Sequence, residues 1–223
     1  MFKKLKMDID AAMRNDPAAR NKFEIWLTYP SVKALRRHRW ANWLFRHGFK
    51  LWARIVSQRT RKTTGIEIHP AATIAPGVFI DHGDGVVIGE TAQVGTGTVL
   101  YQGCTLGGTG KESGKRHPTV GEYCVISAGA KVLGNITVGD YAKVGAGAVV
   151  LRDVPAHATV VGVPGHVVRI GGSKEGVDLY QEKADPMLTE LCALRERVFA
   201  LEEQIGIKYE AKINENLQHP DKD

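Results

Sequence analysis

The sequence predicts an α+β chain in which an N-terminal α-helical domain precedes a parallel β-helix of six-residue repeats and a C-terminal helix. Three observations indicate this class. An aliphatic residue returns at every sixth position over much of residues 68–150, helix-forming segments with breaking residues fill the first part of the chain, and a heptad of apolar residues lies near its end. A period of six fits neither an isolated helix nor an alternating strand, so the repeat itself is the folding unit. The expected domains are residues 1–64, 65–172 and 173–223.

The first domain is expected to consist of amphipathic helices. The first helix should end near Asn15, and Asp16 followed by Pro17 predicts a new helix start, with Asp16 as the N-cap. Pro30 breaks the chain again, and a long helix, or two helices with a bend near Gly48, should follow. The buried side of this part is predicted to hold Leu35, Trp43, Leu44, Leu51, Trp52 and Ile55.

The helical domain is strongly basic. Residues 26–65 contain ten Lys or Arg and no Asp or Glu, and the four Trp of the chain all lie there. Basic residues interleaved with aromatic ones occur in proteins that bind nucleic acid or anionic surfaces. No motif with base-reading spacing accompanies them, so we favour a helical domain with a solvated basic face and keep a nucleic-acid or scaffold protein as an alternative.

The repeat region is expected to stack as a solenoid. Three six-residue faces make one coil of about 18 residues, and the aliphatic side chains of each coil stack inward on those of its neighbours. The inward positions are predicted to be Ile68, Ile74, Ile80, Ile88, Val94, Leu100, Leu106, Val120, Ile126, Val132, Val138, Val144 and Val150.

Two interruptions of the repeat hold the polar residues that we expect to be functional. The step between aliphatic positions is eight around residues 81–85, which begin with an aspartate and a histidine. It is 14 around residues 107–118, which are rich in glycine and end in Arg116-His117-Pro118. Insertions in a solenoid become loops on one face, often the binding face.

The end of the chain shows a second kind of pattern. Two proline-containing turns after Val150 are expected to close the last coil. A helix then begins after Asp185-Pro186, and its apolar residues step by 4, 3, 4, 3 and 4: Met187, Leu191, Leu194, Val198, Leu201 and Ile205. A stripe this narrow suits a helix–helix seam, and both a coiled coil and packing on its own subunit remain open.

Cysteine usage and hydropathy limit the other classes. Cys104, Cys124 and Cys192 are odd in number and widely spaced, so we expect reduced thiols and neither a disulfide framework nor a cysteine zinc site. No apolar run approaches the roughly 18 residues needed to cross a bilayer, and the first residues lack a signal-peptide core. We therefore expect a cytoplasmic protein without a bound metal and without membrane or nucleic-acid partners.

Several segments, in this order, resemble the serine O-acetyltransferase family across about residues 8–170. They are Asn15-Asp16-Pro17-Ala18, Ile68-His69-Pro70-Ala71-Ala72, Ile80-Asp81-His82, Gly89-Glu90-Thr91-Ala92, Thr105-Leu106-Gly107-Gly108-Thr109-Gly110-Lys111, Arg116-His117-Pro118 and Gly162-Val163-Pro164. The resemblance implies a left-handed parallel β-helix that transfers acetyl from acetyl-CoA to the hydroxyl of L-serine. The product is O-acetyl-L-serine for cysteine biosynthesis, and L-cysteine is implied as a feedback inhibitor.

The implied chemistry assigns roles to individual residues. A serine hydroxyl is a poor nucleophile at neutral pH, so a base must accept its proton, and histidine has a suitable pKa. His82 is predicted to be this base. Glu67, where the family commonly has Asp, lies almost one coil before His82 and is predicted to orient it. His117 is predicted to hydrogen-bond the substrate or the tetrahedral oxyanion.

Substrate binding needs charges of both signs. Arg116 is predicted to bind the carboxylate of serine, and Asp81 and, by resemblance, Asp16 its ammonium group. Acetyl-CoA is expected in a groove between neighbouring solenoids. The groove should be lined by Gly108, Thr109, Ala128 and Ala146, with Lys143 or Lys111 near the phosphates. A groove between subunits requires an oligomer, and the helical domain, shorter than in hexameric members, favours a homotrimer.

Alternative functions remain. A metal-dependent lyase of the γ-carbonic anhydrase type needs converging histidines, and His69, His82 and His117 lie near the loops without the paired H-x4-H of that family. Another hexapeptide acetyltransferase, acting on a sugar or antibiotic hydroxyl, is a second alternative. Relatives that bind O-acetylserine sulfhydrylase usually end in Ile, whereas this sequence ends in Asp221-Lys222-Asp223, so we do not expect that complex.

Overall fold

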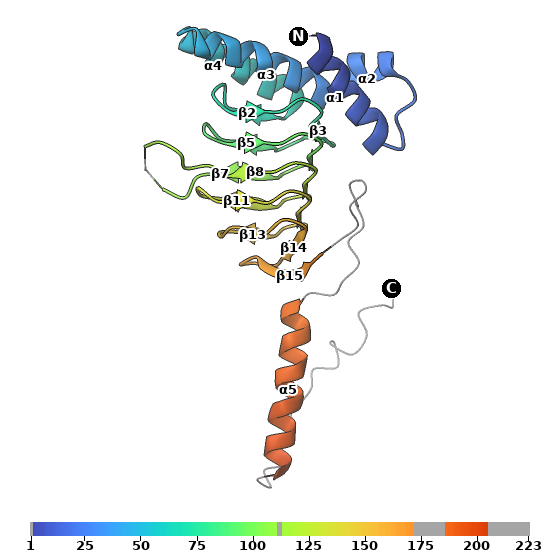
Figure 1. Cartoon of the computed structure of the whole chain (residues 1–223), viewed down its shortest axis with the longest axis vertical. Coiled ribbons are helices and arrows are strands. Elements are labelled where there is room, and N and C mark those ends of the chain that lie inside the picture. Colours follow the sequence, from blue (N-terminus) through green and yellow to red (C-terminus); the bar gives the residue numbers. More distant parts are fainter. Residues whose placement is uncertain (1, 111–112, 172–185, 205–223) are drawn as a thin grey trace. The chain divides into compact units, whose positions relative to one another are not determined.

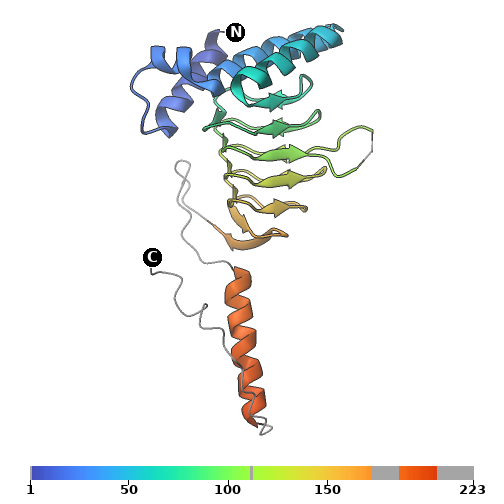
Figure 2. The same ribbon diagram turned by 180° about the vertical axis from the view of Figure 1, so that it is seen from behind.

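Four helices precede a stack of short strands in the computed structural model, which describes residues 2–110, 113–171 and 186–204 (Figure 1). Residues up to Lys183 form one unit and those from Ala184 a second, and each is described by itself. The helices of the first unit are α1 (Phe2–Asn15), α2 (Lys22–Thr28), α3 (Pro30–Arg46) and α4 (Lys50–Thr64). They lie across the N-terminal end of the strand stack (Figure 2).

The turn between α1 and α2 differs from the prediction. The Asp16 side chain accepts a hydrogen bond from Ala18 N at 2.8 Å, but no helix follows. The next helix instead begins at Lys22, where the Asn21 side chain caps it by accepting from Glu24 N at 2.9 Å. The predicted helix start at Asp16 is therefore wrong, because its cap closes one turn that the chain does not continue.

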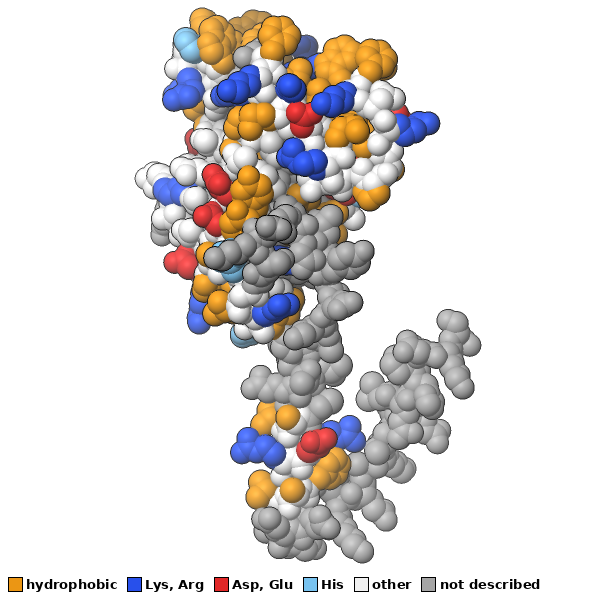
Figure 3. Space-filling view, turned by 45° about the vertical axis from the view of Figure 1, so that its right-hand side comes forward, with side chains coloured by type: hydrophobic (Ala, Val, Ile, Leu, Met, Phe, Trp, Pro, Cys, Tyr) orange, Lys and Arg blue, Asp and Glu red, His pale blue; other side chains and the backbone are white. Residues whose placement is uncertain are grey.

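The break between α3 and α4 is confirmed, but their predicted buried side is largely wrong. Gly48 has φ 86 between the two helices, a conformation that glycine adopts without strain. Leu35 is 1% exposed, whereas Trp43, Leu51 and Trp52 are 50%, 71% and 60% exposed. Figure 3 shows hydrophobic and basic side chains mixed on the surface over these helices.

Small and polar side chains, rather than the predicted large apolar ones, face the strand stack. The buried residues of α4 are Ala53, Ser57, Thr60 and Thr64. The Ser57 hydroxyl donates to Ile68 O at 2.7 Å, and from α3 the Asn42 amide donates to Pro70 O at 2.8 Å. Helices that approach the backbone of the first coil this closely leave no room for tryptophan on the facing side.

The strands form three parallel sheets. The first has the order β1 (Glu67–Ile68), β4 (Val87–Ile88), β7 (Thr105–Gly107), β10 (Lys131–Leu133), β13 (Val149–Val150). The second has the order β2 (Thr73–Ile74), β5 (Gln93–Val94), β8 (Thr119–Val120), β11 (Thr137–Val138). The third has the order β3 (Phe79–Ile80), β6 (Val99–Leu100), β9 (Val125–Ile126), β12 (Lys143–Val144), β14 (Ala158–Val161), β15 (His166–Ile170). Of the strands in the described residues, only β15, which ends the stack, runs antiparallel to its neighbour.

The predicted solenoid core is confirmed. All the predicted inward positions are buried except Ile74, which is half-buried against the same cluster. Strand pairing superimposes inward residues of successive coils, as in Ile80 on Leu100 and Leu100 on Ile126. Cys104 and Cys124 are free and buried in this core, and burial raises the pKa of each thiol to about 12.

The helices also pack on the outside of the third sheet. Phe79 and Val99 point outward from β3 and β6, yet both are buried, because α1, α2 and α3 cover them with Ala11, Ile25 and Val32, among others. The buried Asp8 carboxylate pairs with Arg39 and accepts from Gly77 N at 2.9 Å. This packing fixes the turn after α1 beside the third sheet.

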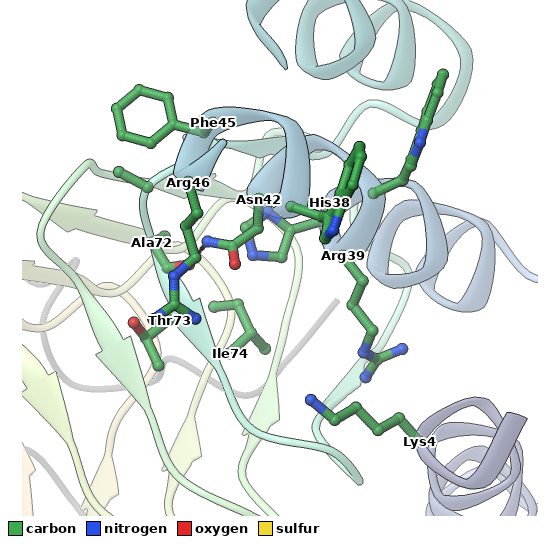
Figure 4. Close-up of a pocket in the computed structure, with 12 residues that line it drawn as sticks. Lys4, His38, Arg39, Asn42, Phe45, Arg46, Ala72, Thr73 and Ile74 are labelled. Atoms are coloured by element: carbon green, nitrogen blue, oxygen red, sulfur yellow. Dashed lines mark hydrogen bonds between the residues drawn. The ribbon is translucent and has the colours of Figure 1, made fainter. Parts of the chain in front are cut away.

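A cavity of about 820 Å³ lies between α3 and the segment around β2 (Figure 4). His38, Asn42 and Ile74 line it, together with the basic side chains of Lys4 and Arg46. His38 is 6% exposed, and its Nδ1 is the one buried side-chain polar atom without a hydrogen-bond partner in the described residues. Burial lowers the pKa of His38 to about 4, so the ring is neutral at pH 7.

Acid should destabilise the protein through His38. Its pKa is about 4 in the folded chain and about 6.5 when unfolded, so its contribution is fully present above pH 6.5 and is lost as the pH falls toward 4. The loss amounts to about 3 kcal/mol. The free energy of unfolding can be measured with urea at fixed protein concentration. Between pH 7 and pH 4, the His38→Gln variant should lose about 3 kcal/mol less of it than wild type. The exposed His47, replaced by Gln, is the control, and equal pH profiles for wild type and His38→Gln would contradict the assignment.

The second unit contains α5 (Pro186–Gln204), which begins at the predicted proline. Among the described residues, no helix is both long and apolar enough to cross a membrane. The predicted boundary near residue 64 coincides with Gly65, the C-cap of α4, but helices and strands share one unit, and the division at residue 172 lies outside the described residues. The three-domain division stays a prediction.

Candidate active site

The first loop places His82 at the corner between the third and first sheets. Its backbone has φ 57, a left-handed conformation that is rare for residues other than glycine and is often found at functional sites. The His82 side chain is 75% exposed. The Asp81 carboxylate accepts a hydrogen bond from His82 N at 2.9 Å and lies 4.0 Å from His82 Nε2. The imidazole is thus free to meet a substrate from outside the chain.

Asp16 joins this corner from the helical domain. Its carboxylate accepts a hydrogen bond from the Tyr29 hydroxyl at 2.5 Å, which raises the pKa of Tyr29 to about 12. Burial raises the pKa of Asp81, and the negative charge of Asp16 raises it further. The structure therefore brings Asp16, Asp81 and His82 together into one acidic pole.

Glu67 lies on the same corner but pairs with another side chain. Glu67 N donates to Val86 O at 2.8 Å, which places β1 beside the end of the His82 loop. Its carboxylate is 3.2 Å from Arg61 Nε, at the end of α4. Among the described residues, the Glu67 carboxylate contacts Arg61 and not His82. The carboxylate nearest to His82 is that of Asp81.

The second loop is organised by Thr91. The Thr91 hydroxyl accepts from Arg116 N at 3.0 Å and His117 N at 3.1 Å, and it lies 2.9 Å from His117 Nδ1. Thr91 N donates to the same Nδ1 at 3.2 Å. Because a backbone N–H only donates, Nδ1 must be an acceptor, and the ring proton of neutral His117 resides on Nε2. His117 thereby presents an N–H donor.

An ion pair and a close packing contact fix this loop against the turn after β4. The Arg116 guanidinium donates to the Glu90 carboxylate at 2.5 Å, which lowers the pKa of Glu90. Burial lowers the pKa of His117, and the positive charge of Arg116 lowers it further, so the ring is neutral at pH 7. A Cβ atom on Gly89 would lie 1.9 Å from His117 Cδ2. Only glycine at position 89 leaves room for the imidazole.

The residues predicted to bind acetyl-CoA divide between two corners. Strand register places His82, Ala128 and Ala146 in one column, each two residues after an inward aliphatic position. Gly108 and Thr109 instead lie at the opposite end of the first sheet, with Gly108 beside Arg116 and His117. Lys143 points outward from β12 in the third sheet, and Lys111 lies outside the described residues.

A single chain therefore keeps the two loops apart. The acidic pole precedes β4, whereas the basic pole of Arg116 and His117 sits on the turn after β4. The two corners are separated by the extended residues of this face, Val86 to Gly89, which span roughly 10 Å, and by the turn at each end. Figures 1 and 2 show the described parts of the second loop projecting from the strand stack. The two poles of one chain therefore lie on different corners of the β-helix.

The same geometry separates the histidines of the metal alternative. His69 is on the corner of His117, and its Nδ1 accepts from Ala71 N at 3.1 Å. His82 is on the other corner. Within residues 2–110, 113–171 and 186–204, no group of three or more His, Cys, Asp or Glu side chains is arranged to hold a metal ion.

Sequence reasoning gave no role to three residues that build the poles. Thr91 sets the tautomer of His117, Glu90 holds Arg116, and Tyr29 holds Asp16. Glu90 and Thr91 lie in the segment Gly89-Glu90-Thr91-Ala92, whose polar residues inside an aliphatic repeat were the available signal. Tyr29 had no such signal, because its partner is 13 residues away in an irregular turn.

Comparison with known proteins identifies the family. The family model described as bacterial transferase hexapeptide (six repeats) matches residues 117–152. The chain is 50% identical over 215 residues to the serine acetyltransferase of Bacillus subtilis, which covers 96% of this chain and 99% of the relative. The chain belongs to the serine acetyltransferase family. The expected fold class of this acetyltransferase, helices followed by a left-handed parallel β-helix and a C-terminal helix, is thereby confirmed.

Solved serine acetyltransferases share the architecture. One in complex with cysteine has a TM-score of 0.74 and 42% identity, and the match covers 75% of this chain and 69% of that one. The enzyme of Brucella abortus in complex with coenzyme A has a TM-score of 0.75 and 42% identity, covering 77% of this chain and 68% of that one. Membership of this family makes the chain an acyltransferase.

Proposed function

We infer that this protein transfers the acetyl group of acetyl-CoA to the hydroxyl of L-serine, giving O-acetyl-L-serine and coenzyme A. The observation that carries this function is the pair of oppositely charged poles. Asp16 and Asp81 match an ammonium group, and Arg116 matches a carboxylate. Serine carries both an ammonium and a carboxylate group near its hydroxyl, whereas a simple sugar carries neither charge. The two poles therefore favour an amino-acid acceptor over a sugar or antibiotic.

Both poles meet only in an oligomer. We place each site between two chains, with His82, Asp81 and Asp16 from one and Arg116 and His117 from the next. A cyclic trimer closes such head-to-tail contacts into three equivalent sites. The same contact brings the column of Ala128 and Ala146 opposite Gly108 and Thr109 of the neighbour, a groove of small residues in which pantetheine amides can approach the backbone.

The proton moves through His82. As the serine hydroxyl oxygen attacks the thioester carbonyl carbon, the imidazole of His82 accepts the hydroxyl proton. The oxygen of the tetrahedral intermediate accepts a hydrogen bond from His117 Nε2–H. When the C–S bond breaks, the thiolate of coenzyme A takes the proton from His82, so no net charge remains on the enzyme.

The carboxylate that orients His82 is assigned to Glu67. Glu67 lies beside the His82 loop through its backbone bond to Val86, and its longer side chain must leave Arg61 to reach the imidazole. Asp81 is the alternative, because its carboxylate already lies 4.0 Å from His82 Nε2. Glu67→Gln should therefore lower turnover more than it raises either KM; an unchanged turnover would transfer the orienting role to Asp81.

Release of free thiol from acetyl-CoA, measured with and without L-serine, tests the proposed function. Thiol should appear only with L-serine, and mass spectrometry should find one O-acetylserine for each thiol. Hydroxyl-bearing sugars and D-serine serve as acceptor controls. Faster release with a sugar than with L-serine would reject the function while leaving acyl transfer intact. Salt-sensitive binding to duplex DNA without thiol release would favour the nucleic-acid alternative.

Arg116 should act on serine binding in particular. Its charged hydrogen bonds contribute about 1.5–3 kcal/mol, so Arg116→Ala should raise the KM for L-serine about 10–100-fold. The KM for acetyl-CoA should change far less. Arg116→Lys is the matched variant, because it keeps the charge but loses the planar fork and should be intermediate. Equal effects on both KM values would refute the carboxylate assignment.

Regulation and location complete the proposal. L-Cysteine has the shape of serine with a thiol in place of the hydroxyl, so it should compete with L-serine as an end-product inhibitor. We propose a cytoplasmic homotrimer, with Lys143 or Lys111 near the phosphates of acetyl-CoA. We do not propose a complex with O-acetylserine sulfhydrylase.

A further inference from the structure

Helix α5 carries a stripe of apolar side chains that are exposed to solvent. Leu191, Leu194, Val198 and Leu201 are 63%, 50%, 52% and 58% exposed. Their steps of 3, 4 and 3 residues place them on one narrow line of a helix, in heptad positions a, d, a and d. The exposed Phe199, at position b, lies off this line against the Arg195 guanidinium, so the seam itself stays narrow and favours a coiled coil over packing on a globular core.

The charges beside the stripe specify what covers it. With Leu191 at position a, the sequence has Glu190 and Arg197 at g positions and Arg195 and Glu202 at e positions. In parallel helices in register, each g position faces the next e position of the other helix. The heptad positions in the sequence then pair position 190, a Glu, with position 195, an Arg, and position 197, an Arg, with position 202, a Glu. Both contacts join opposite charges.

The opposite orientation is disfavoured by the same residues. In an antiparallel pair that keeps the stripe aligned, e positions face e positions and g positions face g positions. Arg195 would then lie against Arg195 of the second helix, and Arg197 against Arg197. Repulsion between these like charges disfavours the antiparallel pair.

We propose that α5 forms a parallel, in-register coiled coil with α5 of other copies of this chain. The charge pattern is complementary to itself, so the occupant of the stripe is the same sequence. Cyclic symmetry gives the required parallel orientation, because rotation about one axis keeps all copies pointing the same way. A helix of 19 residues is too short to form a stable coiled coil by itself, so tethering to an assembled β-helix supplies the needed local concentration.

Cysteine cross-linking in the full-length protein tests the proposal. In a Cys192→Ser background, Leu194→Cys puts a thiol at a d position, where parallel in-register helices bring identical residues together. Glu196→Cys, at the outward f position, is the matched control. Cys104 and Cys124 are buried and should not react. Under mild oxidation, Leu194→Cys should form interchain disulfides at least about tenfold faster than Glu196→Cys.

Two further outcomes would overturn the proposal. Equal cross-linking of both variants means that the stripe does not face another copy of α5. Cross-linking of Leu194→Cys with Val198→Cys chains, but not with itself, means an antiparallel pair. A charge exchange tests register independently, since Arg197→Glu should slow the Leu194→Cys cross-link and Glu202→Arg added to it should restore the rate. Acetyl transfer is not the readout, so failure here leaves the proposed function untouched.

Discussion

Replacement of His82 by alanine is expected to lower turnover by about 10²–10⁴-fold, the range usual for loss of a general base. The KM values for both substrates should change little, because the imidazole acts on the proton rather than on the charges of serine. Steady-state thiol release measures both quantities. Near-normal turnover would remove His82 from the role of base.

His157 provides the matched control for this experiment. It is a histidine with the same left-handed backbone, φ 59, at a different corner, and its ring stacks on Tyr141 with centroids 5.0 Å apart. His157→Ala removes an imidazole from a strained turn without touching either pole, so it should keep wild-type turnover. A comparable loss in both variants would show that the effect comes from the fold rather than from chemistry.

Mixing two inactive variants is expected to restore activity, because the proposed site takes His82 from one chain and His117 from the next. His82→Ala and His117→Ala should each be nearly inactive alone. In randomly mixed trimers, each mixed assembly regains one site with both histidines, and recovery should reach about a quarter of wild-type activity. Co-expression of the two chains followed by thiol-release assays measures the recovery.

A second mixture separates this prediction from general stabilisation. His82→Ala and Asp81→Asn alter the same pole, so no mixed site has that pole intact, and mixing them should restore nothing. Recovery in both mixtures, or in neither, would contradict a site shared between two chains. The experiment also tests whether the protein is an oligomer, since independent monomers exchange no residues.

The repeat was the part of the fold that sequence predicted best. Each coil buries its aliphatic residue on the coils above and below, so a side chain such as Leu100 or Ile126 must return at a fixed step. Polar insertions cannot enter that stack, and both therefore emerge as loops. The residues of the two poles were predicted because the resemblance assigned them and the loops contained them.

The helices were predicted less well. Helical periodicity indicated that α3 and α4 have two faces, but Trp43 and Trp52 lie outward and Ala53 and Ser57 inward. Which face is buried depends on how closely the partner surface approaches, and the backbone of the first coil admits only small side chains. Asp16 likewise has a capping signal, yet its other carboxylate oxygen binds Tyr29.

The sequence alone determined that this protein is a solenoid interrupted by two loops and which side chains those loops carry, because a six-residue period and its interruptions are local properties. Only the tertiary structure decided that His82 and the Arg116-His117 pair lie on different corners, about one sheet width apart. The corner on which each residue lies depends on how each coil closes. It also depends on the position of β4, which lies between the two corners. That separation is the physical reason why we propose a site shared between two chains.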